Sequence, residues 1–354
     1  MNIKLPISLC MIVKNEEDFL DASLKSVINI LALDDLVVVD TGSTDKTKEI
    51  AETNGARLFE FEWIRDFSAA RNYAADKAIN DWVLYLDADE VIKDADINFL
   101  NNFINTTGTS SVGSISMIAH PSLETSQWTR FYNRKTHRLE GTIHEQIVPI
   151  GNYSREIVPM AITGIHYGYD PQVKASKGKF ERNSTMLEEA LQKQPDDPYI
   201  LAQLGKCYYV NGMDLYKACD YFERALTIGD DYRLEYIYTS VEQYGYSLLN
   251  TEQYEKALEH IHKYSKLYNH KPEFQFLSAH IFQNNGLFQE AVESYESCIN
   301  ADIFDPQGIT SFLSYYNIGV ILECVGMIED AIEMYKKCGD YEPALKRLVE
   351  LIPT

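Results

Sequence analysis

The sequence lacks several features that would place the protein in a membrane or outside the cell. No apolar run approaches the ~18 residues that cross a bilayer. The apolar segment 7–13 runs directly into Lys14, Asn15 and two glutamates, without the small-residue cleavage site of a signal peptide. The six cysteines form no CxxC pair, and most lie in helix-like apolar patterns. We therefore expect no transmembrane segment, reduced core cysteines and a cytoplasmic location.

Positive charge is scarce as well. The chain has 32 Lys and Arg against 53 Asp and Glu, a net charge of −21. Nucleic acids and anionic membranes are bound by clustered Lys and Arg, so neither is expected as the main partner. No G-x-G-x-x-G turn is present, which speaks against a dinucleotide-binding fold. With 45% hydrophobic residues, the 354-residue chain can form ordinary cores, and roughly 150 residues per domain suggests two domains.

The N-terminal half has the pattern of an α/β domain. Short β-branched apolar runs predict strands at residues 7–13, 36–39, 58–61 and 83–86. Helical spacing covers residues 19–31 and 47–53 between them, which indicates a mostly parallel sheet with both faces covered. Polar clusters follow three of these strands, at the sheet edge where such folds bind ligands. They are residues 14–16, 40–43 and 87–90.

The C-terminal half is helical and repetitive. A small residue precedes an alanine by twelve or thirteen positions, and a large side chain follows the alanine by four. The pairs are Gly205–Ala218, Gly245–Ala257, Ala279–Ala291 and Gly319–Ala331, and the large residues are Phe222, Ile261, Tyr295 and Tyr335. This pattern predicts four tetratricopeptide-like helix pairs, closed by a helix over 341–351, with generic helical hairpins as the alternative. A basic connector, 170–179, and a turn at 194–198 separate the halves.

The strongest local signal for chemistry is Asp87-Ala88-Asp89-Glu90, directly after the apolar run 82–86. Two converging carboxylates repel one another unless a cation or a proton lies between them. Mg²⁺ or Mn²⁺, with phosphate oxygens completing the shell, is the natural occupant. The alternative is an acidic turn that caps the following helix.

Four segments occur in an order that resembles the family 2 glycosyltransferases, which have the nucleotide-sugar-binding GT-A fold. They are residues 8–17, 37–45, 66–72 and 87–90, and the resemblance covers about residues 5–165. It implies a GT-A glycosyltransferase domain over 1–170, a connector and helix over 171–196, and the repeat domain over 197–354. It also implies a UDP-sugar donor, a divalent metal on Asp87 and Asp89, and inversion at the anomeric carbon.

The resemblance also assigns nucleotide-sugar-binding residues. Asp40 matches the carboxylate that holds the base or ribose, with Gly42 in the same turn; the alternative is a turn aspartate that bonds its own backbone. Asn15 and Glu16 are expected at the rim, although Asn15 is almost as plausible as a helix N-cap. Asp87 and Ala88, directly after the predicted strand at 83–86, are also expected to bind the nucleotide sugar.

A helix that begins at Asp66 or Ser68 is expected to present Arg71 and Asn72 to the nucleotide. Arg71 would offset the charge of the diphosphate. The alternative for Arg71 is a surface or core-bridging arginine.

A second group of motifs, 131–134 and 139–146, is similar to a subgroup that includes lipopolysaccharide-core glucosyltransferases and bacteriocin peptide S-glycosyltransferases. It implies that Glu145 is the catalytic base. His144 would join Asp87 and Asp89 on the metal, bind a phosphate oxygen, or be structural. Neighbouring side chains of a strand face opposite ways, so either the segment bends here or only one of the two enters the pocket. His166 is a further pocket candidate.

Tetratricopeptide arrays bind extended peptides or partner proteins. The peptide S-glycosyltransferase subgroup shares this layout, including segments that match 168–171, 182–183 and 188–189 here. We expect transfer of a hexose to a Cys, Ser or Thr side chain of a peptide or protein, with a possible homodimer. Transfer to a lipid-linked or surface saccharide is a close alternative. A further alternative is that the protein is no enzyme but a repeat scaffold. The intact carboxylates of Asp40, Asp87, Asp89 and Glu145 argue against it.

Overall fold

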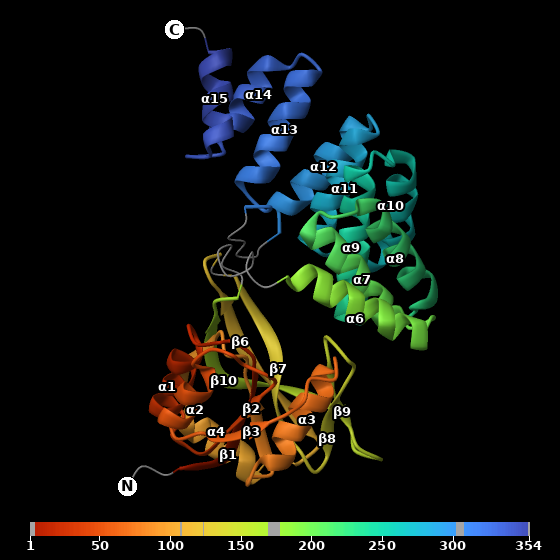
Figure 1. Ribbon diagram of the computed structural model, residues 1–354. Coiled ribbons are helices and arrows are strands. Elements are labelled where there is room, and N and C mark those ends of the chain that lie inside the picture. The colour runs from red at the N-terminus through yellow and green to blue at the C-terminus, as the bar shows by residue number, and fades with distance from the viewer. Residues whose placement is uncertain (1–3, 107, 123, 169–177, 302–307, 353–354) are drawn as a thin grey trace. The chain divides into compact units, whose positions relative to one another are not determined.

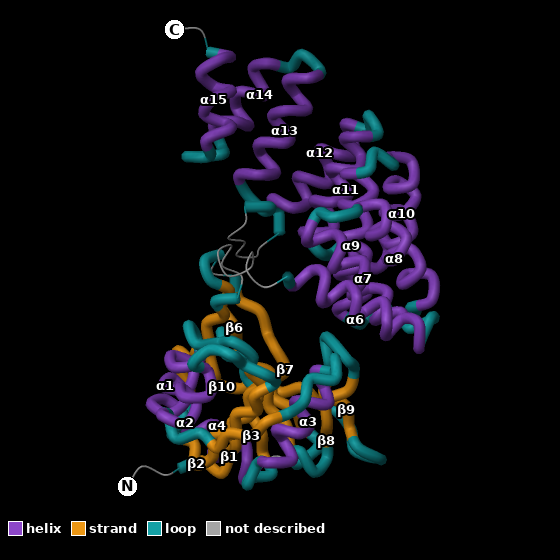
Figure 2. Tube along the Cα trace, in the orientation of Figure 1, coloured by secondary structure: helices purple, strands orange, loops and turns teal. Residues whose placement is uncertain are grey.

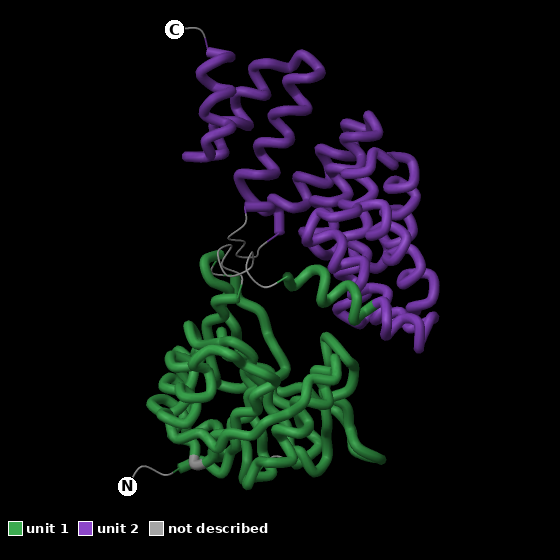
Figure 3. The backbone as a smooth tube through the Cα atoms, in the orientation of Figure 1, with its two compact units in different colours: residues 1–187 green, residues 188–354 purple. Residues whose placement is uncertain are grey.

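The computed structural model describes residues 4–106, 108–122, 124–168, 178–301 and 308–352, and the chain divides into two compact units, 1–187 and 188–354 (Figure 3). The first unit contains a sheet covered by helices and the second consists of helices (Figure 2). The predicted fold class, an α/β domain followed by helical repeats, is confirmed. The segment that matches 168–171 lies mostly outside the described residues.

The first unit is built around an eight-stranded sheet of order β3-β2-β1-β4-β7-β6-β10-β5, with β8 and β9 in a separate two-stranded sheet (Figure 1). The elements are β1 (Leu5–Val13), α1 (Leu20–Ile30), β2 (Leu33–Asp40), α2 (Thr47–Thr53), β3 (Arg57–Glu60), α3 (Phe67–Lys77), β4 (Trp82–Tyr85), β5 (Glu90–Ala95), α4 (Ile97–Thr106), β6 (Ser111–Ala119), β7 (Thr125–Asn133), β8 (His137–Glu140), β9 (Gln146–Pro149) and β10 (Glu156–His166).

The four predicted strands correspond to β1–β4 and pair in parallel, with β1 between β2 and β4. Alternate residues of β1 enter different cores: Leu9 and Met11 belong to one apolar cluster, and Cys10 belongs to the cluster on the other face. This explains why β1 is apolar along its whole length. The antiparallel strand β7 pairs with β4 and was not recognised in the sequence.

Parallel pairing brings the polar strand ends to one edge of the sheet. Val13 lies opposite Asp40 in the register of β1 and β2. Beyond the strands, the Thr41 N–H donates to the carbonyl of Val13 (2.9 Å), and the Leu86 N–H points at the carbonyl of Cys10 (3.4 Å). The turns that follow β1, β2 and β4 are therefore neighbours, as the sequence predicts.

The second unit contains the four predicted helix pairs and the closing helix. They are α7 (Pro198–Asn211), α8 (Leu215–Ile228), α9 (Glu235–Asn250), α10 (Tyr254–Tyr268), α11 (Pro272–Asn284), α12 (Phe288–Ile299), α13 (Phe312–Cys324), α14 (Ile328–Lys336) and α15 (Glu342–Leu351). The repeated small residues lie where helices cross. A Cβ on Gly205 would come within 2.6 Å of the Phe222 ring, and one on Gly319 within 2.7 Å of the Tyr335 ring. Close approach thus excludes larger side chains.

The helix α6 (Lys179–Lys193) contains the boundary between the two units. The turn after it leads into α7, where the Asp197 carboxylate caps the helix by accepting from the N–H groups of Tyr199 (2.8 Å) and Ile200 (3.1 Å).

All six cysteines are free thiols; Cys324 is exposed, so it is not the core residue that we expected. None of the described helices is long and apolar enough to cross a membrane.

His260 makes the stability of the helical unit dependent on pH. Its Nε2 lies 2.7 Å from the carbonyl oxygen of Val241, and burial lowers the pKa of His260 from 6.5 to about 4. The neutral imidazole therefore contributes fully above pH 6.5, and this stability is lost as the pH falls toward 4. Between pH 7.5 and pH 5 we expect His260 to lower the unfolding free energy by about 2 kcal/mol.

Urea unfolding followed by far-UV circular dichroism at both pH values measures this difference. His260→Gln should flatten the pH dependence, whereas His262→Gln, at an exposed position of the same helix, should keep it. An unchanged slope in His260→Gln would contradict the assignment.

Candidate active site

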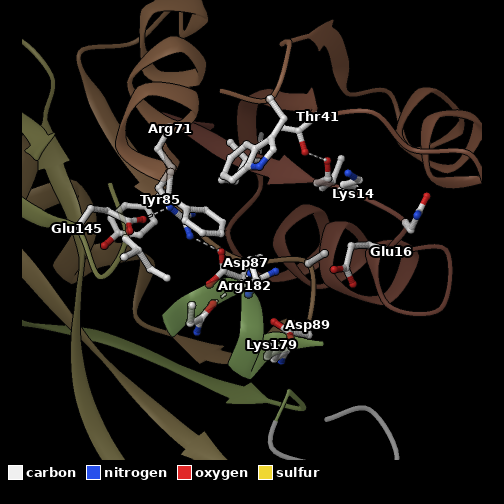
Figure 4. A pocket seen from close by; sticks show the side chains of 18 of the residues that line it. Lys14, Glu16, Thr41, Arg71, Tyr85, Asp87, Asp89, Glu145, Lys179 and Arg182 are labelled. Atoms are coloured by element: carbon white, nitrogen blue, oxygen red, sulfur yellow. Dashed lines mark hydrogen bonds and ion pairs between the residues drawn. The ribbon is translucent and has the colours of Figure 1, made fainter. Parts of the chain in front are cut away.

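A cavity of about 810 Å³ lies at the carboxyl ends of the parallel strands (Figure 4). Its size is in the range of pockets that hold a substrate or cofactor. Charged, aromatic and amide side chains line it. They include Lys14, Asn15, Glu16, Asp18, Trp63, Phe67, Arg71, Tyr85, Asp87, Asp89, Arg130, His144, Glu145, His166, Lys179, Arg182 and Asn183.

The carboxylate of Asp87 lies between two arginines. Arg71 Nη2 donates to Asp87 Oδ1 (2.6 Å), and Arg130 Nη2 lies 3.3 Å from Asp87 Oδ2. Burial by itself would raise the pKa of Asp87, but the two guanidinium groups outweigh it and hold this pKa well below its usual range. Asp87 is therefore a fixed anion at the end of β4.

Each arginine also binds a second carboxylate. Arg71 pairs with Glu145, and Arg130 pairs with the fully buried Glu90. Burial raises the pKa of Glu90, while Arg130 opposes this shift. Both guanidinium groups lie within 5 Å of the centre of the Tyr85 ring, and the Tyr85 hydroxyl donates to the Thr129 carbonyl (2.9 Å). We call the series Glu145–Arg71–Asp87–Arg130–Glu90 the buried ion chain.

The buried ion chain does not use all of its hydrogen-bond donors. Arg71 Nη1 and Arg130 Nε are buried and have no hydrogen-bond partner among the described residues. Arg71 is 8% exposed and Arg130 is 9% exposed, and both line the cavity. Buried donors without a partner are rare in proteins, so these two suit an anionic ligand that accepts from them.

Asp89 lies beside a histidine, but not the one predicted. His166 Nε2 is 3.5 Å from Asp89 Oδ1. A Cβ on Gly168 would clash with the Asp89 carboxylate and come within 2.7 Å of His166 Nε2, so the glycine leaves room for this pair. Two ligands of one octahedral ion at about 2.1 Å lie about 3 Å apart, so Asp89 and His166 fit a shared divalent cation.

The predicted metal shell of Asp87, Asp89 and His144 is not assembled. Among the described residues, no group of three or more His, Cys, Asp or Glu side chains is arranged to hold a metal ion. Asp87 is engaged by arginines instead. A cation at Asp89 and His166 would thus take further ligands from a bound substrate or from water.

The segment that carries His144 and Glu145 bends. Gly141 has φ = 104° and His144 has φ = 55°, so the backbone leaves the extended conformation here, and both His144 and Glu145 line the cavity. The N–H of Phe67, at the start of α3, donates to the carbonyl of Thr142 (2.8 Å) and fixes this loop. The sequence left open whether the segment bends or only one of these two side chains enters the pocket; the structure shows that it bends.

Asp40 and Gly42 do not line the cavity. The Asp40 carboxylate is buried and accepts from the N–H groups of Gly42 (3.0 Å) and Ser43 (3.0 and 3.2 Å), as in the turn considered as its alternative role. Lys48 Nζ lies 3.6 Å from the same carboxylate. The nucleotide roles of Asp40 and Gly42 stay predictions.

Asn15 and Glu16 both line the cavity. The side-chain oxygen of Asn15 accepts from the Thr44 N–H (2.8 Å), and its own N–H donates to Ser43 Oγ (2.9 Å). The alternative that Asn15 caps a helix is wrong, because α1 begins at Leu20 with Phe19 at the N-cap position. Asn15 instead joins the turns that follow β1 and β2.

Helix α3 begins where the sequence predicts, with Asp66 as its cap: the carboxylate accepts from the Ala69 N–H (2.9 Å). The helix presents Arg71 to the cavity, but Asn72 does not line it. The Asn72 amide donates to the carbonyl of Leu139 (2.8 Å) and accepts from its N–H (3.0 Å), which holds β8. Ala88 lines the cavity between the two aspartates.

Several lining residues were not identified from the sequence, notably Tyr85, Arg130, Lys179 and Arg182. Arg130 directly precedes the motif at 131–134, but the sequence does not show that it lines the cavity from β7. Arg182 belongs to a motif that the sequence pointed to, but no chemistry was assigned to it. Helix α6 brings Lys179 and Arg182 to the cavity from a position far along the chain.

Comparison with known proteins agrees with this geometry. Residues 8–158 match the model of glycosyl transferase family 2. The first unit is a family 2 glycosyltransferase domain. Residues 272–302 and 313–345 match a tetratricopeptide repeat model, so the second unit carries tetratricopeptide repeats. The likeness inferred from the sequence motifs is confirmed for both parts.

Two curated relatives match across most of the chain. A TPR repeat-containing protein of Synechococcus elongatus is 33% identical over 233 residues, which cover 63% of this chain and 57% of the relative. The SPbeta prophage-derived glycosyltransferase SunS of Bacillus subtilis is 25% identical over 234 residues, which cover 62% of this chain and 53% of the relative. The chain thus spans little more than half the length of these relatives.

Among solved structures, the chain resembles YrrB, described as a TPR protein with an unusual peptide-binding site. The TM-score is 0.41 at 24% sequence identity, and the match covers 50% of this chain and 87% of YrrB.

The pairing of Arg130 with Glu90 should be essential for the stability of the glycosyltransferase domain. Arg130→Met leaves the buried Glu90 carboxylate without its counter-charge, and we expect a loss of about 3–5 kcal/mol of unfolding free energy. Urea unfolding followed by tryptophan fluorescence reports on this unit alone, because all three tryptophans (63, 82 and 128) lie in it.

Arg138→Met is the matched control, since Arg138 forms an exposed pair with Glu140; we expect a change of at most about 1 kcal/mol. The double variant Glu90→Gln/Arg130→Met should recover part of the loss. Equal stability of Arg130→Met and Arg138→Met would show that the buried pair is dispensable.

Proposed function

We propose that the protein is an inverting, metal-dependent glycosyltransferase that moves a hexose from a UDP-sugar to a Cys, Ser or Thr side chain of a peptide or protein. The observation that carries this proposal is the cavity of the family 2 domain, where Asp87, Asp89 and Glu145 lie together with buried arginines that have unused donors. The cavity volume suits a donor of this size.

The residues of the cavity have separate roles in this proposal. Asp89 and His166 would hold a divalent cation. When bound, this cation would neutralise the negative charge of the diphosphate. Arg71 and Arg130 offer hydrogen-bond donors to the anionic donor substrate. The buried ion chain keeps Asp87 and Glu145 at fixed positions on the two sides of Arg71.

Glu145 is the proposed base. Its carboxylate accepts the proton of the acceptor S–H or O–H as the sulfur or oxygen forms a bond to the anomeric carbon. The bond from that carbon to the diphosphate breaks, and UDP leaves on the opposite face. Arg71 holds the Glu145 side chain, and the bend at Gly141 and His144 directs it into the cavity.

The repeats support a polypeptide acceptor, because tetratricopeptide units bind extended chain segments. The likeness to a relative named as a glycosyltransferase agrees with transfer chemistry. Transfer to a lipid-linked or surface saccharide is the competing acceptor class, and the acceptor assay below distinguishes the two.

A screen of donor hydrolysis tests the activity and identifies the sugar at the same time. Full-length protein with Mn²⁺ is incubated with a panel of UDP-, GDP- and ADP-sugars, and release of the nucleotide is measured. We expect release from a UDP-hexose. Peptides encoded beside the gene are then incubated with that donor and analysed by mass spectrometry. A glycosylated lipid or saccharide alongside unmodified peptide would replace the proposed acceptor, and no donor binding or release at all would favour a scaffold.

Glu145→Gln should retain donor binding and lose transfer by several orders of magnitude, because the amide cannot accept the proton. Glu140→Gln is the matched control at an exposed position in the strand before the same loop. Donor affinity by calorimetry and transfer rate by mass spectrometry separate the two effects. Near-normal transfer by Glu145→Gln would remove Glu145 as the base.

Asp89→Asn should abolish the Mn²⁺-dependent part of UDP binding, because it removes one of the two proposed protein ligands. Asp94→Asn, at an exposed position of β5, should bind UDP with Mn²⁺ as the wild type does. Titrations with Mn²⁺ and with EDTA give the comparison. If Asp89→Asn kept the full Mn²⁺ effect, the cation would have to be held elsewhere.

A further inference from the structure

The two arginines of the buried ion chain already have carboxylate partners within the protein. Arg71 and Arg130 contribute two positive charges to the buried ion chain, and Glu145, Asp87 and Glu90 contribute three negative charges. This part of the site has a net charge of about −1 if all five groups are ionised. A diphosphate that binds here needs positive charge from outside the buried ion chain.

Helix α6 supplies such charge from outside the matched family region, which ends at residue 158. Lys179 and Arg182 lie in its first turns and line the cavity close to Asp87 and Asp89 (Figure 4). The Arg182 guanidinium lies 5.5 Å from the centre of the Phe67 ring on α3, and Lys179 Nζ lies 3.4 Å from the carbonyl of Gly168. These contacts place the start of α6 beside the cavity.

Among the described residues no carboxylate forms an ion pair with Arg182; Glu16 and Asp87 act on it only from beyond salt-bridge distance, and burial lowers its pKa despite them. Its side-chain hydrogen bond goes to Asn183 Oδ1 (3.1 Å), a neutral group. The start of a 15-residue helix also presents N–H groups and the positive end of the helix dipole. Arg71 lines the same cavity, and its buried Nη1 has no hydrogen-bond partner among the described residues, which is independent evidence for an anion here.

We propose that Lys179 and Arg182 bind the diphosphate of the sugar donor, so that α6 completes the donor site of the glycosyltransferase domain. The inference rests on the proposed function, because it assumes a nucleotide-sugar donor. It extends that function by assigning diphosphate recognition to residues beyond the matched family region. Arg182 donates to the outer phosphate oxygens, while the buried arginines face the same group from the floor.

The test compares UDP with uridine, since only UDP carries the diphosphate. Calorimetric titrations of the full chain, with Mn²⁺ and with EDTA, give the affinity for each in wild type, Lys179→Ala, Arg182→Ala and the double variant. We expect UDP affinity to fall about tenfold or more in Arg182→Ala, because a charge-assisted hydrogen bond is lost, and further in the double variant. Uridine affinity should not change.

Two matched variants complete the experiment. Arg182→Lys should recover part of the UDP affinity, because it restores the charge without the planar donor fork. Lys193→Ala removes an exposed charge at the far end of the same helix and should bind UDP as wild type does.

The outcomes separate this inference from the proposed function. Wild-type UDP affinity in the double variant, or an equal loss of uridine and UDP affinity, would overturn diphosphate binding by α6 and leave the glycosyltransferase proposal intact. If wild-type protein bound none of UDP, GDP and ADP, both proposals would be overturned together.

Discussion

The site depends on the buried ion chain that joins Glu145, Arg71, Asp87, Arg130 and Glu90. Its members come from α3, β7, β5 and two loops, so it connects the parts of the domain that meet at the sheet edge. Charges removed from water are costly unless each has a partner, and here the arginines are shared between carboxylates. The arrangement fixes Asp87 and Glu145, while one buried donor on each arginine has no hydrogen-bond partner among the described residues.

This sharing changes how the acidic motif after β4 works. The two aspartates were expected to act together on one metal, as two converging carboxylates would. In the structure they have different surroundings: Asp87 is neutralised by arginines, whereas Asp89 lies beside His166. The repulsion between the carboxylates is thus relieved by protein cations at Asp87, while Asp89 has His166 as its neighbour.

Sequence reasoning succeeded where local pattern and chain order carry the information. Continuous apolar runs identified β1–β4, the cap at Asp66 identified the start of α3, and the recurring small residues identified the helix pairs of the second unit. It failed where a side chain finds a distant partner. Nothing in the neighbourhood of Asn72 shows that its amide holds the backbone of Leu139, and nothing near His166 shows that it faces Asp89.

The sequence by itself determined the class of the protein: an α/β domain with polar strand ends in the order found in family 2 glycosyltransferases, followed by tetratricopeptide repeats. Apolar periodicity and small residues at crossings are local properties, so they can be recognised before the chain is folded. Only the tertiary structure decided which charges meet. Arg130, His166 and Arg182 reach the cavity from β7, β10 and α6, and pairings between such distant segments follow from strand order and helix packing.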